Sequence, residues 1–399
     1  MTMKKEKLKV LCISLRTPPA VRPQAILIGK MIPEWIRQGV EPVAVTYEGG
    51  EDWDIDIPVY KIPQFKINRY LNKLILLRWF LRFWYYKKIS QTIAEITKKH
   101  NCQVLFSFAN PVESNVIGAK VKKLTGIKYV SHFSDPWYDH PYENFSWRQA
   151  RKILRQEKEF VSLSDWVIFV TKQMRELVMK KYPAEWKKRT EVIPHCYDLK
   201  DYVEVEKNND KFVISYIGVF YKERNPKPLF AALKKAIDRD KSLKSKFRMD
   251  LIGAANNYSG YSQENIKKML AEYDLDDVTE ILPFVEYKES LRLMKLADCL
   301  VVIDANFSNS PFLPSKVVDY AATGTPILGI TPKGSPPAEF LENFGCRSFD
   351  YRQIDELSDY LDKLIKGEIK VNLNQEFLKQ YDVRETSKRL INIFREVLK

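Results

Sequence analysis

The sequence predicts an α/β protein with two Rossmann-like, doubly wound domains that face each other across a cleft. Both halves of the chain begin alike, because the apolar runs at 9–15 and 212–218 each precede a polar loop and a helix-like pattern. Short, continuous apolar runs are typical of buried parallel strands. Strand and helix signals then alternate through each half, which indicates parallel sheets with right-handed crossovers. The length of 399 residues is enough for two such domains.

The individual elements follow from these patterns. Helices are expected at 24–38 and 226–237. Further strand-length apolar runs lie at 42–46, 104–108, 128–132, 166–171, 249–252, 278–282, 299–303 and 326–331. A polar stretch after Pro194 separates the halves. We therefore place the first domain at 1–198 and the second at 199–379, with a final helix at about 380–399 that could pack back on the first domain.

Composition narrows the class of protein. A hydrophobic fraction of 45% and an aromatic fraction of 13% are globular values. The five cysteines are scattered and show no Cys-x-x-Cys spacing, which disfavours a disulfide framework or a zinc site and favours the cytoplasm. The first apolar run is too short for a transmembrane helix and lacks a signal-peptide cleavage pattern.

The net charge of +14 favours anionic partners, which could be nucleic acid, an anionic membrane or a phosphate-bearing substrate. Basic and aromatic residues alternate at 66–88, where no Asp or Glu occurs; the cations are Lys66, Arg69, Lys73, Arg78, Arg82, Lys87 and Lys88. This composition suits the inner face of an anionic membrane, but a helix partly buried in the first domain fits equally. Arg78 and Arg82 would lie roughly opposite Arg69 and Lys73 on one straight helix, so a break between two helices is another solution.

The segment 312–328 is the most informative. It predicts a loop, a short helix that begins near Pro314, and a turn into a strand. The free amides of a helix N-terminus suit a pyrophosphate, and Lys316 would add a full charge. Asp319 lies one turn further along, where its carboxylate could accept hydrogen bonds from a ribose diol. The alternative is a capped helix whose Lys and Asp are merely solvated.

The string Pro314-Ser315-Lys316-x-x-Asp319-Tyr320-x-Ala322-x-Gly324-x-Pro326 resembles the donor-binding signature of GT-B glycosyltransferases of the family 4, or group 1, type. The resemblance implies that Asp319 binds the nucleotide ribose and that Pro314, Ser315 and Lys316 lie at the donor. Pro311 stands where many relatives carry a second acid. Backbone groups at 312–314 are the expected substitute for holding the transferred sugar.

A second match begins at Gly218, which ends the first strand of the second domain. Relatives carry basic residues after this glycine that clamp the donor diphosphate. Val219 occupies the first such place and Arg224 the second, so we expect Arg224, and less firmly Lys222, to hold phosphate. The segment 282–287 resembles the lining of the nucleobase pocket, where the backbone of Phe284 or Val285 is the candidate. Solvated charges and core packing are the alternatives.

In the first half, His132 ends a predicted strand and Asp135 follows it; both are expected to face the acceptor. Asp135 could orient the acceptor hydroxyl or accept its proton. Asp135-Pro136 could instead form only a turn. The loop that contains Arg16 and Arg22 could meet an acceptor phosphate or the donor diphosphate.

Two further motifs resemble a metal site and a phosphate loop, but we do not assign them to a functional site. Asp54-Ile55-Asp56 matches the metal-binding Asp-x-Asp of another glycosyltransferase fold, but it lies in an acidic surface stretch. Gly49-Gly50 lacks the spacing of a phosphate loop. The resemblance implies that no metal and no cofactor is needed, because basic residues and helix dipoles offset the charge of the leaving diphosphate.

The sequence therefore predicts a metal-independent, cytoplasmic hexosyltransferase that acts with retention of configuration. Its donor would be a nucleoside diphosphate sugar, and its acceptor a lipid-linked saccharide or a cell-surface polysaccharide precursor. A nucleotide-sugar epimerase or hydrolase on the same fold is one alternative, and a non-catalytic scaffold at a membrane is another. A nucleic-acid-binding protein is disfavoured because no known nucleic-acid module is present.

Overall fold

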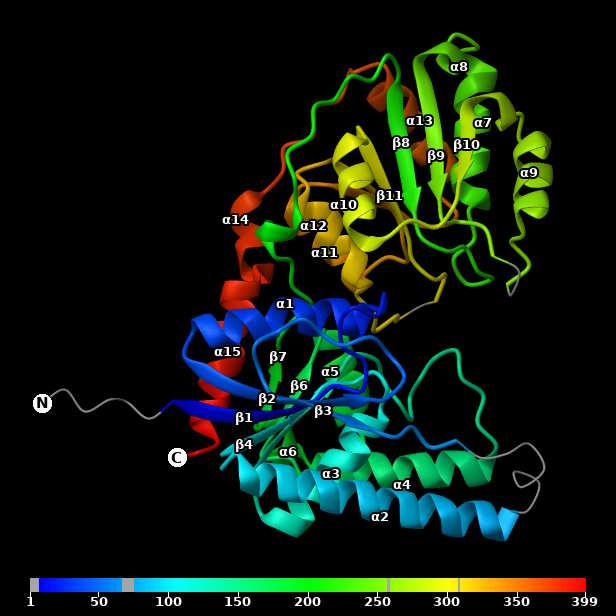
Figure 1. Ribbon diagram of the computed structural model, residues 1–399. Coiled ribbons are helices and arrows are strands. Elements are labelled where there is room, and N and C mark those ends of the chain that lie inside the picture. The colour runs from blue at the N-terminus through cyan, green and yellow to red at the C-terminus, as the bar shows by residue number, and fades with distance from the viewer. Residues whose placement is uncertain (1–6, 67–74, 257–258, 308) are drawn as a thin grey trace, which may run out of the picture. The chain divides into compact units, whose positions relative to one another are not determined.

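The computed structural model describes residues 7–66, 75–256, 259–307 and 309–399. The chain divides into two compact units, which are Met1–His195 together with Val383–Lys399, and Cys196–Asp382. Each unit is built on its own parallel sheet with helices on both faces (Figure 1). The domain boundaries predicted from the sequence lie at 198/199 and 379/380. The predicted α/β class with two doubly wound domains is confirmed.

The first unit contains a seven-stranded sheet in the order β3-β2-β1-β4-β5-β6-β7. Its strands are β1 Leu8–Ile13, β2 Val40–Tyr47, β3 Val59–Ile62, β4 Val104–Ser107, β5 Lys128–Phe133, β6 Trp166–Phe169 and β7 Thr190–Val192. All neighbouring pairs are parallel. The order reverses between β1 and β4, so the first unit has its topological switch point there.

Helices cover both faces of this sheet: α1 Pro23–Arg37, α2 Ile75–Lys99, α3 Glu113–Thr125, α4 Trp147–Leu163, α5 Lys172–Met179, α6 Ala184–Lys187 and α15 Val383–Glu396. Figure 1 shows α1 and α15 on one face, and α2, α3 and α4 on the other. The last helix joins this core, since the ring centroid of Trp35 lies 5.5 Å from that of Phe394 and 5.6 Å from that of Phe106. The C-terminal segment therefore completes the first unit.

Residues 75–88 of the basic, aromatic stretch form the first half of α2, which runs from Ile75 to Lys99 without interruption. Arg69 and Lys73 lie outside the described residues. Tyr86, Ile89 and Ile93 turn inward and are buried. No helix among the described residues is long and apolar enough to span a membrane.

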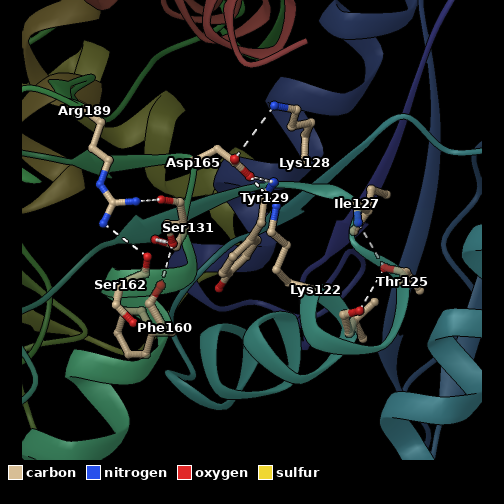
Figure 2. A network of polar contacts seen from close by, with 12 residues as sticks. Lys122, Thr125, Ile127, Lys128, Tyr129, Ser131, Phe160, Ser162, Asp165 and Arg189 are labelled. Atoms are coloured by element: carbon tan, nitrogen blue, oxygen red, sulfur yellow. Dashed lines mark hydrogen bonds and ion pairs between the residues drawn. The ribbon is translucent and has the colours of Figure 1, made fainter.

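A polar network joins the amino-terminal edge of the first sheet to α4 (Figure 2). The carboxylate of Asp165 accepts hydrogen bonds from the Tyr129 amide at 2.7 Å and from Lys122 Nζ at 2.8 Å. The Arg189 guanidinium donates to the carbonyl oxygens of Val161, at 3.1 Å, and of Ser162 and Ser164, which end α4. These contacts satisfy the last carbonyls of the helix, which would otherwise lack partners.

The second unit contains a six-stranded sheet in the order β10-β9-β8-β11-β12-β13. Its strands are β8 Phe212–Ile217, β9 Phe247–Ile252, β10 Thr279–Leu282, β11 Cys299–Ile303, β12 Ile327–Ile330 and β13 Arg347–Phe349. All pairs are parallel, and the order reverses between β8 and β11. The carboxyl ends of β8 and β11 therefore form the switch point of this sheet.

The helices of the second unit are α7 Lys227–Arg239, α8 Leu243–Lys246, α9 Gln263–Glu272, α10 Tyr287–Leu296, α11 Ser315–Ala322, α12 Pro336–Phe344, α13 Ile354–Ile365 and α14 Gln375–Leu378. Short 3₁₀ turns lie at Leu199–Asp201, Asp276–Val278 and Lys379–Tyr381. The core combines β8, β9 and β11 with the apolar faces of α7 and α13, including Tyr216, Phe220 and Phe230. This packing fixes the strand ends that carry the polar residues described next.

Candidate active site

Polar side chains gather where β8 and β11 end. Gly218 directly follows β8, Asp304 directly follows β11, and α11 begins at Ser315. Ligands of open α/β sheets bind beyond the carboxyl ends of the strands, at the point where strand order reverses. The second unit therefore offers its site at this switch point.

Gly218 and Lys316 are in direct contact. Gly218 has a φ of 131°, and a Cβ atom built on it would lie 2.6 Å from Lys316 Nζ. The ammonium donates a hydrogen bond to the Ile217 carbonyl at 3.1 Å and lies 4.8 Å from the ring centroid of Tyr216. Only a glycine leaves room for this cation at the end of β8.

The Lys316 ammonium is electrostatically poised. Its burial, and next the positive charge of Arg224, lower the pKa of Lys316 to about 7, while Asp304 opposes the shift. An anion at this position would favour the protonated amine. The positive charge of the site therefore increases when a negatively charged ligand binds near neutral pH.

Arg224 lies beside Asp304. Its Nη2 is 3.8 Å from Asp304 Oδ1, and its guanidinium carbon is 5.0 Å from the ring centroid of Tyr221. Only 17% of the Arg224 side chain is exposed, and its buried Nε has no hydrogen-bond partner among the described residues. The guanidinium thus retains donor capacity for a ligand.

Asp304 was not singled out in the sequence. It is fully buried, and within the described part of the chain neither carboxylate oxygen has a hydrogen bond of ordinary geometry. Burial raises the pKa of Asp304, an effect opposed first by Arg224 and then by the Ala305 amide, Ser310 and Lys316. Asp304 could have been found from its position, since it is an acidic residue directly after a buried strand. Residues at such positions lie at the edge of a parallel sheet where ligands bind.

Asp319 lies on α11, one turn beyond Lys316, and is 6% exposed. Its Oδ1 accepts hydrogen bonds from the hydroxyls of Tyr202 and Tyr287, each at 3.2 Å. Pro314 precedes the first turn of α11 and provides no side-chain cap; Ser315 is partly buried. Sequence reasoning missed both tyrosines, which come from distant segments.

An exposed aromatic follows β10. Phe284 is 71% exposed, and a Cβ atom on Gly253, after β9, would lie 3.5 Å from the Phe284 Cα. Val285 is partly buried. Because β10, β9, β8 and β11 are neighbours in this order, Phe284 shares an edge of the sheet with Gly218 and Asp304.

The residues predicted to face the acceptor, His132 and Asp135, both belong to the first unit. His132 is a residue of β5, is 5% exposed, and packs against Phe108 with 4.5 Å between ring centroids. Burial, and next the charge of His195, lower the pKa of His132 to about 3, so its imidazole is neutral at pH 7. Asp135 follows β5, is partly buried and accepts a hydrogen bond from Asn110 Nδ2.

The loop after β5 is anchored by a buried acid. Glu157 on α4 accepts hydrogen bonds from the Tyr138 amide at 2.9 Å and the Tyr182 hydroxyl at 2.8 Å, and it pairs with Lys181 Nζ at 2.9 Å. Lys181 also pairs with Asp139. These contacts fix the segment that presents Asp135.

A pocket of about 500 Å³ lies at the carboxyl ends of β1, β2 and β3. Arg16 lines it and lies 5.9 Å from the ring centroid of Tyr47, while Lys61 and Lys66 line the same pocket. Arg22 is exposed at the start of α1 and does not line it.

The two motifs not assigned to a functional site lie on loops. Asp54 and Asp56 are exposed before β3, and Gly49-Gly50 lines the pocket just described. Within 7–66, 75–256, 259–307 and 309–399, no three His, Cys, Asp or Glu side chains cluster as metal ligands.

Two family models match adjoining parts of the chain. Residues 25–201 match Glycosyltransferase Family 4, and residues 200–381 match Glycosyl transferases group 1. The first match covers the first sheet from β2 onward, and the second match contains all of the switch-point residues. No sequence of curated function matches the chain.

Solved structures share the fold over almost the entire chain. Sucrose-phosphate synthase from Thermosynechococcus elongatus is 15% identical with a TM-score of 0.70, and the alignment covers 98% of this chain and 99% of that one. HepE of Anabaena, in complex with UDP, is 16% identical with a TM-score of 0.67, at 98% and 100% coverage. The lipopolysaccharide outer core galactosyltransferase WaaB is 14% identical with a TM-score of 0.66, at 98% and 99% coverage. With two matching family models and this fold, the chain belongs to the GT-B glycosyltransferases of the group 1, or family 4, type.

Proposed function

We propose that this protein transfers a hexose from a nucleoside diphosphate sugar to a saccharide acceptor, and that the switch point of the second unit holds the donor diphosphate. The supporting observation is the meeting of Arg224, Lys316 and the start of α11 beside Gly218. A guanidinium can grip two phosphate oxygens, and amides of the first turn add partial positive charge.

Charge compensation is the chemical task of this cluster. When the sugar leaves, negative charge grows on the diphosphate, and preorganised cations stabilise that charge. In the proposed reaction, Arg224 and Lys316 provide this stabilising positive charge, and no metal ion is required. Asp304 is a positioning residue in this scheme, because its buried carboxylate fixes the guanidinium of Arg224 at 3.8 Å.

The nucleoside would lie along the same edge of the sheet. Asp319, held by Tyr202 and Tyr287, would accept hydrogen bonds from the ribose hydroxyls. Phe284 is exposed and could stack with the base, while the backbone of Phe284 or Val285 would bind the edge of the base. UDP is the first nucleotide to test, since HepE was solved with UDP and the E. coli trehalose-6-phosphate structure with UDP-2-fluoro glucose.

The first unit would bind the acceptor. Asp135 would orient the acceptor hydroxyl, and His132, which belongs to the preceding strand β5, would face the same acceptor as a neutral imidazole. Arg16 in the pocket, with Arg22 nearby in sequence, would meet an acceptor phosphate. We propose a lipid-linked saccharide or polysaccharide precursor as the acceptor, retention of configuration, and a cytoplasmic location.

Arg224→Ala tests this function. We expect turnover of the correct nucleoside diphosphate sugar to fall about 10²–10³-fold, as on loss of one preorganised charge donor. Arg239→Ala, on α7 of the same unit, is the matched control, because that arginine pairs with Asp359 and Ser358 of α13. Circular dichroism should show that both variants stay folded. Unchanged turnover in Arg224→Ala would contradict the proposed site.

A further inference from the structure

One face of α2 exposes three large aromatic side chains. Phe80 is 58% exposed, Phe83 56% and Trp84 53%. The spacing of three and four residues places them together on the helix surface. Such a cluster of exposed apolar area is unusual for a surface that meets only water.

Lysines continue the same face. Lys87 and Lys88 follow at one further turn, both exposed, and Lys88 Nζ lies 5.2 Å from the ring centroid of Trp84. The opposite side of α2 is buried through Tyr86, Ile89 and Ile93. The helix therefore packs through one side and presents aromatic rings and ammonium groups on the other.

A basic cluster flanks the N-terminal half of α2. Lys152 of α4 is close enough to Arg78 and Arg82 that burial and their charges together lower the pKa of Lys152. Arg82 Nη2 lies 3.8 Å from the carboxylate oxygen Oε1 of Glu113. Figure 1 shows α2 and α4 running along the same face of the first unit. The exposed cations of α4 are Arg148, Arg151, Lys152, Arg155 and Lys158, and Trp147 at its start is 67% exposed.

We propose that the exposed face of α2, formed by its three aromatic rings together with Lys87 and Lys88, docks on an anionic lipid bilayer. Aromatic rings prefer the interface between headgroups and acyl chains, and cations beside them meet anionic headgroups. The helix lies on the membrane surface rather than across it, in keeping with its charged residues. Charge complementarity and the aromatic cluster together select this partner.

Nucleic acid is the other polyanion that this charge could attract. A site for single-stranded nucleic acid needs a basic groove that tracks the backbone. Here the aromatic rings stand on the convex surface of a single helix, with lysines on the next turn. This arrangement favours insertion of the rings into a bilayer.

The docking face is connected to the pocket of the first unit. The hydroxyl of Tyr85, on α2, donates to the Pro63 carbonyl at 2.8 Å, and the Tyr85 ring lies 5.3 Å from that of Phe65. Gln64 and Lys66, beside these residues, line the pocket. A lipid-borne acceptor would thus reach the pocket along the membrane; this consequence rests on the proposed function, whereas the docking itself does not.

Vesicle co-sedimentation of the full chain, without nucleotide, tests the docking. We expect binding to phosphatidylglycerol–phosphatidylcholine vesicles, weak binding to pure phosphatidylcholine, and loss of binding at about 0.5 M salt. The triple variant Phe80→Ser, Phe83→Ser, Trp84→Ser and the double variant Lys87→Glu, Lys88→Glu should each lower the partition coefficient at least about tenfold.

Matched controls come from elsewhere in the chain. Leu124→Ser removes a side chain that is 53% exposed on α3, and Lys267→Glu with Lys268→Glu reverses two exposed lysines on α9. Both controls should bind vesicles as wild type does. All variants should keep wild-type melting and nucleotide binding, so failure of docking is distinguishable from failure of the proposed transfer.

Trp84 gives an independent readout. Brominated lipids should quench part of the tryptophan fluorescence, and Trp84→Phe should remove most of that quenching while it preserves sedimentation. Vesicle binding that survives both α2 variants would overturn the proposal. The proposal would also be overturned if wild type bound single-stranded RNA but not vesicles, and the α2 variants lost the RNA binding. That result would assign this face of α2 to nucleic acid.

Discussion

Two polar clusters in this molecule differ in how fully their groups are paired. Around Asp165 and Arg189, at the amino-terminal edge of the first sheet, carboxylate, guanidinium and helix carbonyls contact one another directly (Figure 2). At the switch point of the second sheet, Arg224, Asp304 and Lys316 are brought together but keep unfilled hydrogen-bonding capacity.

This difference separates stability from function. A buried polar group with partners stabilises the fold, whereas one without them costs free energy. The buried Asp304 carboxylate, which has no hydrogen bond of ordinary geometry among the described residues, and the lowered pKa of Lys316 reflect such costs. Strongly perturbed groups in a binding edge indicate a functional site, because an anionic ligand can pair with the buried cations Arg224 and Lys316. The paired cluster should therefore govern folding and the unpaired one donor binding.

Among the changes that compare the two clusters, the largest expected effect is on donor affinity in Lys316→Met. Methionine preserves much of the side-chain volume but removes the charge that faces the diphosphate. We expect the affinity for UDP, measured by calorimetry at pH 7, to fall about tenfold to a hundredfold, as for loss of one charged hydrogen bond. Equal affinity in the variant would place the diphosphate elsewhere.

Arg189→Met also replaces a cation by methionine, but in the paired cluster. It should lower the stability of the fold and leave donor affinity unchanged. The variant leaves the carbonyls of Val161, Ser162 and Ser164 without their donor. We expect the free energy of unfolding, from urea denaturation, to drop by about 1–3 kcal/mol, with UDP affinity unchanged. A loss of affinity without a loss of stability would erase the distinction between the clusters.

A smaller effect is expected on the ligand-free stability of Lys316→Met. In the unfolded chain the pKa of Lys316 is near the ordinary lysine value of 10.5, and burial lowers this pKa to about 7 in the folded chain. The unfolded state binds more protons between these values, so the cost of burying Lys316 is full below about pH 7 and shrinks as pH rises toward 10. Relative to wild type, the variant should therefore be stabilised at pH 6 and stabilised less at pH 9. A gain that is independent of pH would show that Lys316 is not the titrating group.

Much of the fold was predictable because buried parallel strands leave continuous apolar runs, as in β5 and β11. The edge strands β3 and β13 were not predicted, since they are short and partly exposed and lack that pattern. The possible break in the basic stretch is not seen in α2 from Ile75 onward, because Arg82 finds Tyr86 and Glu113 on the packed side.

The part of the candidate site that is formed by a single continuous segment was predictable from the sequence. The run from Pro314 to Asp319 lies on one short helix, so its sequence spacing translates directly into geometry. Tyr202, Tyr287 and Asp304 come from other segments and meet this helix only after the sheet forms. The roles assigned to His132, Asp135 and Arg16 stay predictions.

Proton uptake on UDP binding tests the central claim most directly. A diphosphate beside Lys316 should raise its pKa above 7, so binding at pH 8 should take up a proton. Calorimetric titrations in two buffers of different ionisation enthalpy measure this uptake. We predict a clear fractional uptake in wild type and in Arg189→Met, and its loss in Lys316→Met. UDP binding without uptake in wild type, or with the same uptake in Lys316→Met, would contradict a diphosphate site at the switch point of the second unit.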